Sequence, residues 1–343
     1  MNRKVEMPSR RDILRVGSAG LAAGVLGTPA LAAARKPKKV ARIAHLTDIH
    51  VQPELNAGQG MAKCLQHASS KNGKVDLILF GGDMVMDTYG QTRSRTKTQW
   101  DLFKSVLKEN CTIPVEHCIG NHDIWGWDKT ASGTTGSEPD FGKKMALEMF
   151  EIPNRYRSFD RFGWHFVVLD SVQPNGEKNY LGRLDDEQFE WLKGDLAAVP
   201  KQTPVLVLSH IPILTATNFL DTKTEIEPGD FTIAKSDMLM DCRRIVSLFA
   251  QYPNVKIALS GHIHMRDRVD YNGVSYLCDG AVCGSWWWGN HYETEPGYAV
   301  LDLFDDGTFA QQYFAWGWKR EGVAPKAVVQ SYEESAALMH SIL

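Results

Sequence analysis

The sequence predicts a layered α/β domain, and three observations lead to this prediction. Runs of consecutive apolar residues alternate along the chain with longer runs whose apolar residues recur every three to four positions. The first pattern is typical of strands buried on both faces, and the second of helices with one buried side. The 343 residues, 43% of them hydrophobic, are enough for one large core. Strands buried on both faces need covering layers, so the domain is expected to be layered.

The expected elements follow in order along the chain. The central strands are predicted at 41–47, 75–80, 115–119, 205–208 and 255–259, because each range is almost continuously apolar. A hairpin that turns at Gly163 is predicted from 157–162 and 165–170, and 268–313 is strand-like. Helices are predicted from apolar spacing at 61–70, 98–109, 142–150, 185–198, 236–250 and 332–342. The Gly/Ser/Thr-rich range 128–140 is expected to be a surface loop, and the irregular range 215–233 a lid.

The first 34 residues resemble a twin-arginine export signal. Arg10 and Arg11 precede a weakly apolar stretch rich in Gly and Ala, with small-residue cleavage sites near 30–32. A membrane anchor is the alternative, but several glycines and Pro29 make a poor lipid-spanning helix. The resemblance implies export in folded form by the twin-arginine machinery, to the periplasm or outside the cell, with no stable membrane anchor. A basic spacer at 35–39 would then precede the main domain, 40–304, on which a C-terminal strand and helix, 305–343, would pack.

Charge and cysteine content restrict the possible functions further. The formal net charge of -3 argues against a broad basic surface for nucleic acid. The six cysteines show no Cys-X-X-Cys spacing, so neither a zinc knuckle nor a thioredoxin motif is indicated. A disulfide remains possible in an oxidising compartment, and Cys278 and Cys283 are the closest pair in sequence.

Polar residues capable of binding metal follow the apolar strands. In layered α/β folds, ligand sites form where the C-terminal ends of strands meet. Carboxylate, amide and imidazole groups together exceed what one tetrahedral zinc uses. They suit two divalent cations about 3.5–4 Å apart that share a bridging carboxylate. The mixture of nitrogen and oxygen ligands without thiolate favours Zn, Mn, Fe, Co or Ni. The residues are Asp48, His50, Asp83, Asn121, His122, His210, His262 and His264.

These residues lie in motifs that resemble those of the calcineurin-like metallophosphoesterase superfamily, over about 41–264. The resemblance implies an αββα sandwich of two mixed β-sheets flanked by helices. The stretch from Leu181 to Leu192 also resembles a helix that precedes the fourth motif in many members. The motifs are Asp48-X-His50, Gly82-Asp83, Gly120-Asn121-His122-Asp123, His210 and Gly261-His262-X-His264.

The resemblance also implies a role for each site residue. Asp83 would bridge the two metals, and a hydroxide that they share would attack phosphorus. His122 would stabilise the transition state or protonate the leaving oxygen, and Asp123 could orient His122 or a metal-bound ligand. Some members have a tyrosine or an aspartate where this chain has Met86, which leaves Asp87 as a possible partner of His122. Asp48, His50 and His264 would bind one metal, and Asn121, His210 and His262 the other.

Aromatic residues near the motifs are candidates for substrate binding, although packing of the C-terminal strands explains them equally well. They are Trp125, Trp286, Trp287, Trp288 and His291. The expected function is that of an exported dinuclear metal-dependent phosphoesterase acting on a small phosphoester, with a diester preferred over a monoester by resemblance. The alternatives are a non-catalytic protein that binds metal or a phosphorylated ligand, and a hydrolase of another bond, such as an amide or a sulfate ester.

Overall fold

The computed structural model describes residues 35–70, 73–176, 179–220, 225–227 and 229–319. The segment 1–34, predicted to be an export signal, and the predicted helix 332–342 lie outside these residues. The description below concerns the unit that begins at Pro37. Among the described residues, no helix combines the length and the apolar character needed to cross a membrane.

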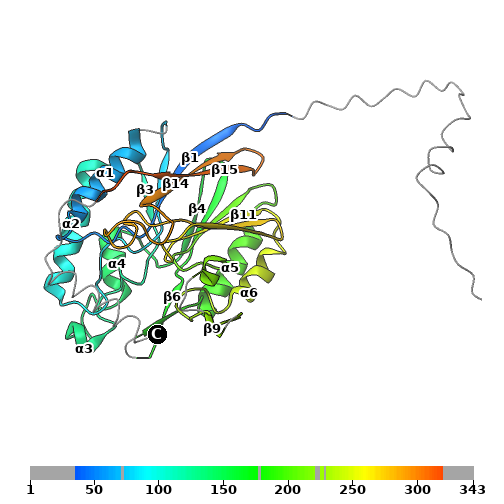
Figure 1. Ribbon diagram of the computed structural model, residues 1–343. Helices are drawn as coiled ribbons and strands as arrows, with labels where there is room; N and C mark the ends of the chain where they lie inside the picture. The colour runs from blue at the N-terminus through cyan, green and yellow to red at the C-terminus, as the bar shows by residue number, and fades with distance from the viewer. Residues whose placement is uncertain (1–34, 71–72, 177–178, 221–224, 228, 320–343) are drawn as a thin grey trace, which may run out of the picture. The chain divides into compact units, whose positions relative to one another are not determined.

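Two large mixed sheets form the centre of this unit (Figure 1). In the first sheet, β1, β2 and β3 are parallel, whereas β14 is antiparallel to β1 and to β15. Its order is β15 (Phe309–Ala315), β14 (Gly297–Phe304), β1 (Lys39–Leu46), β2 (Leu77–Phe80) and β3 (Val115–His117).

In the second sheet, the four inner strands are parallel and both edge strands are antiparallel to their neighbours. Its order is β12 (Asp267–Tyr271), β13 (Val274–Cys278), β11 (Val255–Ser260), β8 (Val205–Leu208), β5 (Trp164–Val168) and β4 (Arg157–Arg161). The five predicted apolar strands are all present, and the predicted hairpin at Gly163 is formed by β4 and β5.

The central strands are buried on both faces, as their continuous apolar sequences predict. Successive side chains point to opposite faces of a strand, so each strand contributes to two cores. Ile43 and Leu206 belong to a cluster shared by strands of both sheets. Their neighbours Ala44 and Val207 belong to a second cluster that includes residues of the helices. The shared cluster is therefore the layer between the sheets, and the helices cover the outer faces.

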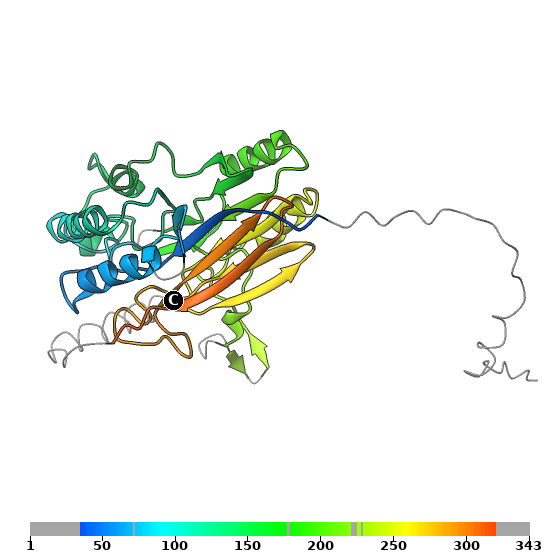
Figure 2. The ribbon, with the colours of Figure 1, turned by 90° about the horizontal axis from the view of Figure 1, so that it is seen from above.

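The helices complete the αββα arrangement that the resemblance implies. Figures 1 and 2 show α1 (Ala57–Ser70) and α2 (Arg93–Asn110) beside the first sheet, and α5 (Asp186–Ala198) and α6 (Cys242–Phe249) beside the second. Phe150 of α4 (Lys143–Phe150) stacks on His117 of β3. The Asp185 side chain accepts a hydrogen bond from the Gln188 N–H and caps α5. The predicted fold class is confirmed.

Several local predictions were wrong. A hairpin formed by β6 (Val172–Asn175) and β7 (Asn179–Gly182) was not expected, because its strands lack a long apolar run. The predicted loop 128–140 contains the short helix α3 (Lys129–Ser132), and the helix predicted at 236–250 is limited to α6. The range 215–233, predicted to be irregular, contains a 3-10 turn (Thr217–Phe219) and the strands β9 (Glu225–Glu227) and β10 (Asp230–Phe231), and its role as a lid stays a prediction. All six cysteines are free thiols, so Cys278 and Cys283 form no disulfide.

His165 of β5 is expected to stabilise the fold more at low pH than at high pH. Its Nδ1 lies 2.7 Å from Asp160 Oδ1 and its Nε2 lies 2.9 Å from Asp195 Oδ2. Although burial alone would lower it, these carboxylates raise the pKa of His165 above its ordinary value. The stabilisation is fully present below the unfolded-state pKa of about 6.5 and is lost as the pH rises through the raised folded-state pKa. Urea unfolding of the wild type and His165→Gln should show the larger difference in free energy at pH 6, and equal differences at pH 6 and pH 9 would contradict the prediction.

Candidate active site

The site residues lie just beyond the C-terminal ends of β1, β2 and β3 in the first sheet and of β8 and β11 in the second. Backbone hydrogen bonds join these ends within each sheet. The Asp48 N–H donates to the Gly82 carbonyl (3.0 Å), and the Gly261 N–H donates to the His210 carbonyl (3.0 Å). Across the sheets, His210 Nδ1 lies 2.8 Å from the Gly81 carbonyl. The predicted motifs therefore meet at one edge of the sandwich.

Left-handed backbone conformations are concentrated at this edge. The φ angles are 54° at Asp48, 47° at His50, 57° at Asp83, 73° at His262 and 58° at His264. Residues other than glycine adopt such angles rarely, and each instance costs on the order of 1–3 kcal/mol. Because five such residues lie at one edge, the surrounding structure must stabilise an unfavourable backbone conformation that sets the directions of these side chains.

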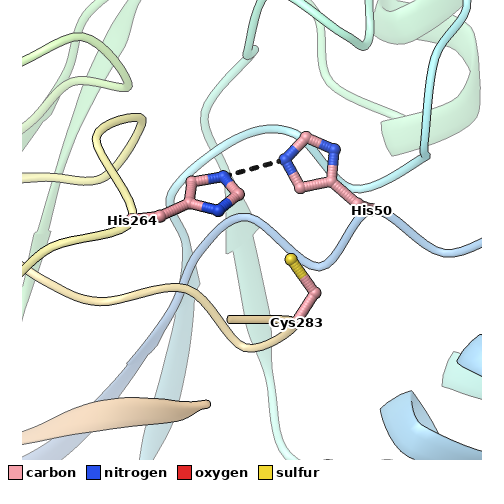
Figure 3. Close-up of side chains that lie close together, drawn as sticks. All are labelled: His50, His264 and Cys283. Carbon is pink, nitrogen blue, oxygen red and sulfur yellow. Dashed lines mark hydrogen bonds between the residues drawn. The ribbon is translucent and has the colours of Figure 1, made fainter. Parts of the chain in front are cut away.

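Three side chains form a first group of possible metal ligands. His50 Nε2 lies 3.1 Å from His264 Nε2, and Figure 3 shows the two rings facing one another. Asp48 Oδ1 lies 3.4 Å from His264 Nε2 and 3.9 Å from His50 Nε2. All three residues are buried. One cation could therefore contact all three, and we name these residues the first ligand group.

A second ligand group consists of Asn121, His210 and His262. His210 Nε2 lies 3.0 Å from Asn121 Oδ1 and 3.2 Å from His262 Nδ1. Asp83 lies between the two groups, because its Oδ2 is 3.2 Å from His210 Nε2 and 3.7 Å from His50 Nε2. Its other oxygen, Oδ1, accepts a hydrogen bond from the His122 N–H (2.8 Å). Asp83 Oδ2 is thus free to contact a cation in either group.

Hydrogen bonds to backbone carbonyls orient three of the imidazoles. Carbonyl oxygens only accept, so a nitrogen that bonds to one must carry the proton. His210 Nδ1 bonds to Gly81 O (2.8 Å) and His264 Nδ1 to Gly284 O (2.6 Å). His50 Nδ1 makes a longer contact with Met86 O (3.4 Å). In their neutral forms these rings present an unprotonated Nε2 to the site, which is the usual arrangement of metal-binding histidines.

The electrostatics of the site favour bound cations. Burial alone would raise the pKa of Asp83, but the neighbouring His210 and His122 hold it well below its usual range. Burial and the adjacent His210 lower the pKa of His262 to about 3, so this ring is neutral. Against the effect of burial, Asp83 raises the pKa of His210 to about 9. Buried carboxylates thus draw positive charge to this place, which metal ions can supply, and the donor set fits two of them.

His122 lies beside the two ligand groups. Its ring packs edge-on against the ring of His50, with centroids 4.7 Å apart. Its Nδ1 is buried without a hydrogen-bond partner, and the nearest carboxylate oxygen is Asp87 Oδ1, 3.7 Å away. Asp87 Oδ1 is held in place by the Tyr89 N–H (2.9 Å). Asp87, rather than a residue at the position of Met86, is therefore placed to interact with the His122 ring.

Asp123 does not orient the His122 ring, contrary to one of the two roles considered for it. Its Oδ2 accepts hydrogen bonds from the N–H groups of Asp83 and Gly120, each 2.9 Å long. Its Oδ1 accepts one from the Met84 N–H, also 2.9 Å long. Both oxygens are therefore occupied by the backbone of the two motifs that carry Asp83 and His122. Asp123 is a positioning residue that joins these turns.

Asp123→Asn is expected to lower the free energy of unfolding by about 1–3 kcal/mol, since the new amide N–H₂ group must face a backbone N–H that then has no acceptor. Burial and the neighbouring Asp83 raise the pKa of Asp123 to about 7, so urea unfolding should be measured at pH 8, where Asp123 is ionised. Asp101→Asn is the matched control, because Asp101 is exposed on α2, where it pairs with Lys97. Equal stability of the two variants would contradict the prediction.

The structure excludes two of the predicted substrate-binding tryptophans. Trp125 is 2% exposed and its Nε1 donates to the Gln91 carbonyl (3.0 Å). Trp287 is fully buried and its Nε1 donates to the His50 carbonyl (2.9 Å). These prediction errors have one cause: an indole beside a motif in the sequence can pack beneath the site instead of lining it. Trp288 is partly exposed, with its backbone N–H bonded to Ser285 O.

Trp286 and His291 do lie beside the first ligand group. The Trp286 ring centroid is 4.7 Å from that of His264 and 6.0 Å from that of His50. The His291 ring is 5.4 Å from the His264 ring and 5.8 Å from the Trp286 ring. These two predicted residues therefore border the site.

Three further residues near the site were not predicted. Tyr180 of β7 lies with its ring 6.2 Å from that of His262, and the ring of Tyr89 is 6.1 Å from Tyr180. The Cys283 thiol lies beside His50 and His264, with the possible ligand atoms of the three within 4.8 Å of one another (Figure 3). Tyr180 belongs to the unexpected hairpin, and Cys283 has no motif spacing, so no sequence signal pointed to them.

Comparison with known proteins agrees with this geometry. Residues 41–266 match the family described as calcineurin-like phosphoesterase. The chain belongs to this family. Its members depend on a dinuclear metal centre, and the chain is a metal-dependent phosphoric ester hydrolase. The predicted enzyme class is confirmed.

Several curated proteins are similar to most of this chain. A 3′,5′-cyclic-nucleotide phosphodiesterase from Nostoc sp. is 24% identical over 78% of this chain and 89% of its own length. The 3′,5′-cyclic adenosine monophosphate phosphodiesterase CpdA of Haemophilus influenzae is 25% identical over 79% of this chain and 88% of its own. Among solved structures, a dimetal phosphatase from Danio rerio has a TM-score of 0.56 at 15% identity, covering 82% of this chain and 98% of its own, which supports the fold.

Proposed function

We propose that this enzyme hydrolyses a phosphodiester with two bound divalent cations and that its substrates are 3′,5′-cyclic nucleotides. The observation that carries the dinuclear centre is the position of Asp83, whose Oδ2 lies between the two ligand groups. The substrate class is supported by the names of the relatives from Nostoc sp. and Haemophilus influenzae.

The two ligand groups supply the residues that would hold the cations. Asp48, His50 and His264 would bind one cation, and Asn121, His210 and His262 the other, with Asp83 bound to both. Two cations held in this way lower the pKa of bound water and neutralise charge on the phosphoryl oxygens. The hydrogen bonds to Gly81 O and Gly284 O fix His210 and His264 with their Nε2 atoms toward the site.

His122 would act on the leaving group. A diester releases an alkoxide, which is a poor leaving group unless it receives a proton as the ester bond breaks. His122 is 8% exposed, so it is sheltered while still reachable from the site. The Asp87 carboxylate, 3.7 Å from Nδ1, would orient the His122 ring. Protonated His122 then donates its proton to the leaving oxygen.

We also propose export by the twin-arginine route. The support is the sequence alone, with Arg10 and Arg11 ahead of a weakly apolar, Gly- and Ala-rich stretch. Cell fractionation of the full chain should find the mature enzyme outside the cytoplasm. Replacing both arginines with lysine should retain it inside, and unchanged export would overturn this part of the proposal.

Substrate comparison tests the proposed reaction. The metal-loaded enzyme would be given 3′,5′-cyclic AMP, bis-p-nitrophenyl phosphate, p-nitrophenyl phosphate and p-nitrophenyl sulfate at equal concentrations. We expect a higher kcat/KM for both diesters than for the monoester, no sulfate hydrolysis, and a nucleoside monophosphate as the product in phosphorus NMR. A preference for the monoester or for the sulfate ester would contradict the proposal.

A further inference from the structure

The loop that carries Trp286 is held tightly at both ends. Gly284 and Gly289 pair with each other, and the Ser285 N–H donates to the Gly289 carbonyl (2.9 Å). A Cβ atom on Gly284 would lie 2.1 Å from that carbonyl oxygen, so the closure requires glycine. Within the loop, Trp286 and Trp287 have φ angles of 44° and 74°. Bulky residues adopt these angles only where the surroundings impose them.

Trp287 anchors the loop in the core. Its Nε1 donates to the His50 carbonyl (2.9 Å), and its ring packs against Trp318, with centroids 5.2 Å apart. On α1, a Cβ atom at Gly60 would lie 2.2 Å from the Trp287 ring, which leaves no room for movement there. Because Trp287 is fixed, its neighbour Trp286 is held in a defined position beside His264.

Trp286 has the properties of a ligand-binding surface. It is partly exposed, although its ring lies beside two residues of the first ligand group. Its Nε1 is buried and has no hydrogen-bond partner. An unpaired buried donor is unfavourable, and a bound molecule with an acceptor at that place would satisfy it. The left-handed backbone, the partly exposed side chain and the unpaired donor together favour a bound ligand at this place.

Tyr180 lies beside the second ligand group, where it belongs to a separate cluster of aromatic rings. Its ring lies edge-on to His262 and to Tyr89, at 6.2 Å and 6.1 Å, and Tyr89 is also edge-on to Trp127. Trp286 also has ring neighbours, since its centroid lies 4.7 Å from that of His264, 5.8 Å from that of His291 and 6.0 Å from that of His50. Among the described residues, the Trp286 side chain has a buried donor without a hydrogen-bond partner and the Tyr180 side chain does not, which favours Trp286 as the ligand-binding surface.

We propose that Trp286 is the stacking surface for the nucleobase of the substrate and so determines specificity for nucleotides over other phosphodiesters. The proposal rests on the proposed cyclic-nucleotide function and names the residue that would recognise the base. Any planar base can stack favourably on an indole ring, whatever hydrogen-bond donors and acceptors lie along the edge of the base. Selectivity among bases is therefore expected to be weak.

Binding measurements isolate the contribution of the base. Isothermal titration calorimetry of the metal-loaded protein with 5′-AMP, ribose 5-phosphate and inorganic phosphate would be compared in the wild type and in Trp286→Leu. We expect the wild type to bind 5′-AMP about 10-fold more tightly than ribose 5-phosphate, because stacking of one base contributes about this much to affinity. Trp286→Leu should lose most of this affinity ratio. Binding of inorganic phosphate should be unchanged.

Three variants complete the test. Trp286→Phe retains a ring and should give a ratio between those of the wild type and Trp286→Leu. Trp191→Leu is the matched control, because Trp191 lies on the outer helix α5 against Tyr156, and it should bind all three ligands as the wild type does. Tyr180→Leu tests the rival surface and should retain the ratio.

The proposal is overturned if the wild type shows no preference for 5′-AMP, if Trp286→Phe is as impaired as Trp286→Leu, or if Tyr180→Leu loses the ratio instead. These readouts require no turnover. A failure of the proposed reaction would appear separately, as the absence of bis-p-nitrophenyl phosphate hydrolysis by the wild type.

Discussion

Asp83→Asn is expected to lower kcat for phosphodiester hydrolysis by a factor on the order of 1,000 or more, because removing a single preorganised electrostatic group already costs 100- to 1,000-fold. Asp83 Oδ2 is the atom that lies between the two ligand groups, so the neutral amide would weaken both. Metal content measured by atomic emission should fall together with activity. Steady-state kinetics with saturating metal would show whether the loss lies in kcat.

The matched control for Asp83→Asn is again Asp101→Asn, which makes the same chemical change on the exposed surface of α2. It should retain wild-type metal content and kcat. Full activity of Asp83→Asn with two metals bound would show that Asp83 does not join the two ligand groups. The same change is expected to affect every diester equally, since both cations act on the phosphoryl group whatever the leaving group.

His122→Ala is expected to discriminate between leaving groups. General acid catalysis contributes about 100- to 10,000-fold when the leaving group needs a proton. The loss of kcat should therefore be at least about 100-fold for 3′,5′-cyclic AMP, which releases an alkoxide, and much smaller for bis-p-nitrophenyl phosphate, which releases a stable phenolate. The measurement is kcat for both substrates at one pH and one metal concentration.

An equal loss on both substrates would contradict proton donation by His122. It would instead indicate that the ring stabilises charge on the phosphoryl group, the other role considered for it. Asp87→Asn provides a graded comparison, because the Asp87 carboxylate lies 3.7 Å from His122 Nδ1. That variant should show a smaller loss with the same preference for the leaving group.

Much of the site could be predicted from the sequence because each ligand candidate follows an apolar strand. Parallel strands bring their C-terminal ends to one edge, so Asp48, Asp83 and Asn121 of the first sheet had to lie close together. The second sheet brings His210 and His262 together in the same way. What joins the two sheets could not be predicted, because the contact of His210 Nδ1 with Gly81 O depends on how the sheets pack.

The aromatic residues show where sequence information is insufficient. Trp286 and Trp287 are chemically identical neighbours, yet one borders the site and the other is buried beneath His50. Both residues have left-handed backbone angles, which tryptophan rarely adopts. The direction of each ring could therefore not be predicted from the residue type. Asp123 was placed near the site, but its three backbone hydrogen bonds depend on the spacing of two separate turns.

The central claim is that two cations, held on either side of Asp83, are needed for phosphodiester hydrolysis. The most direct test is to remove all metal from the purified enzyme and titrate it with manganese, zinc, iron(II), cobalt or nickel while measuring hydrolysis of bis-p-nitrophenyl phosphate. We expect activity to rise until about two equivalents per chain are bound, as a dinuclear site requires. Full activity at one equivalent, or without added metal, would contradict the account.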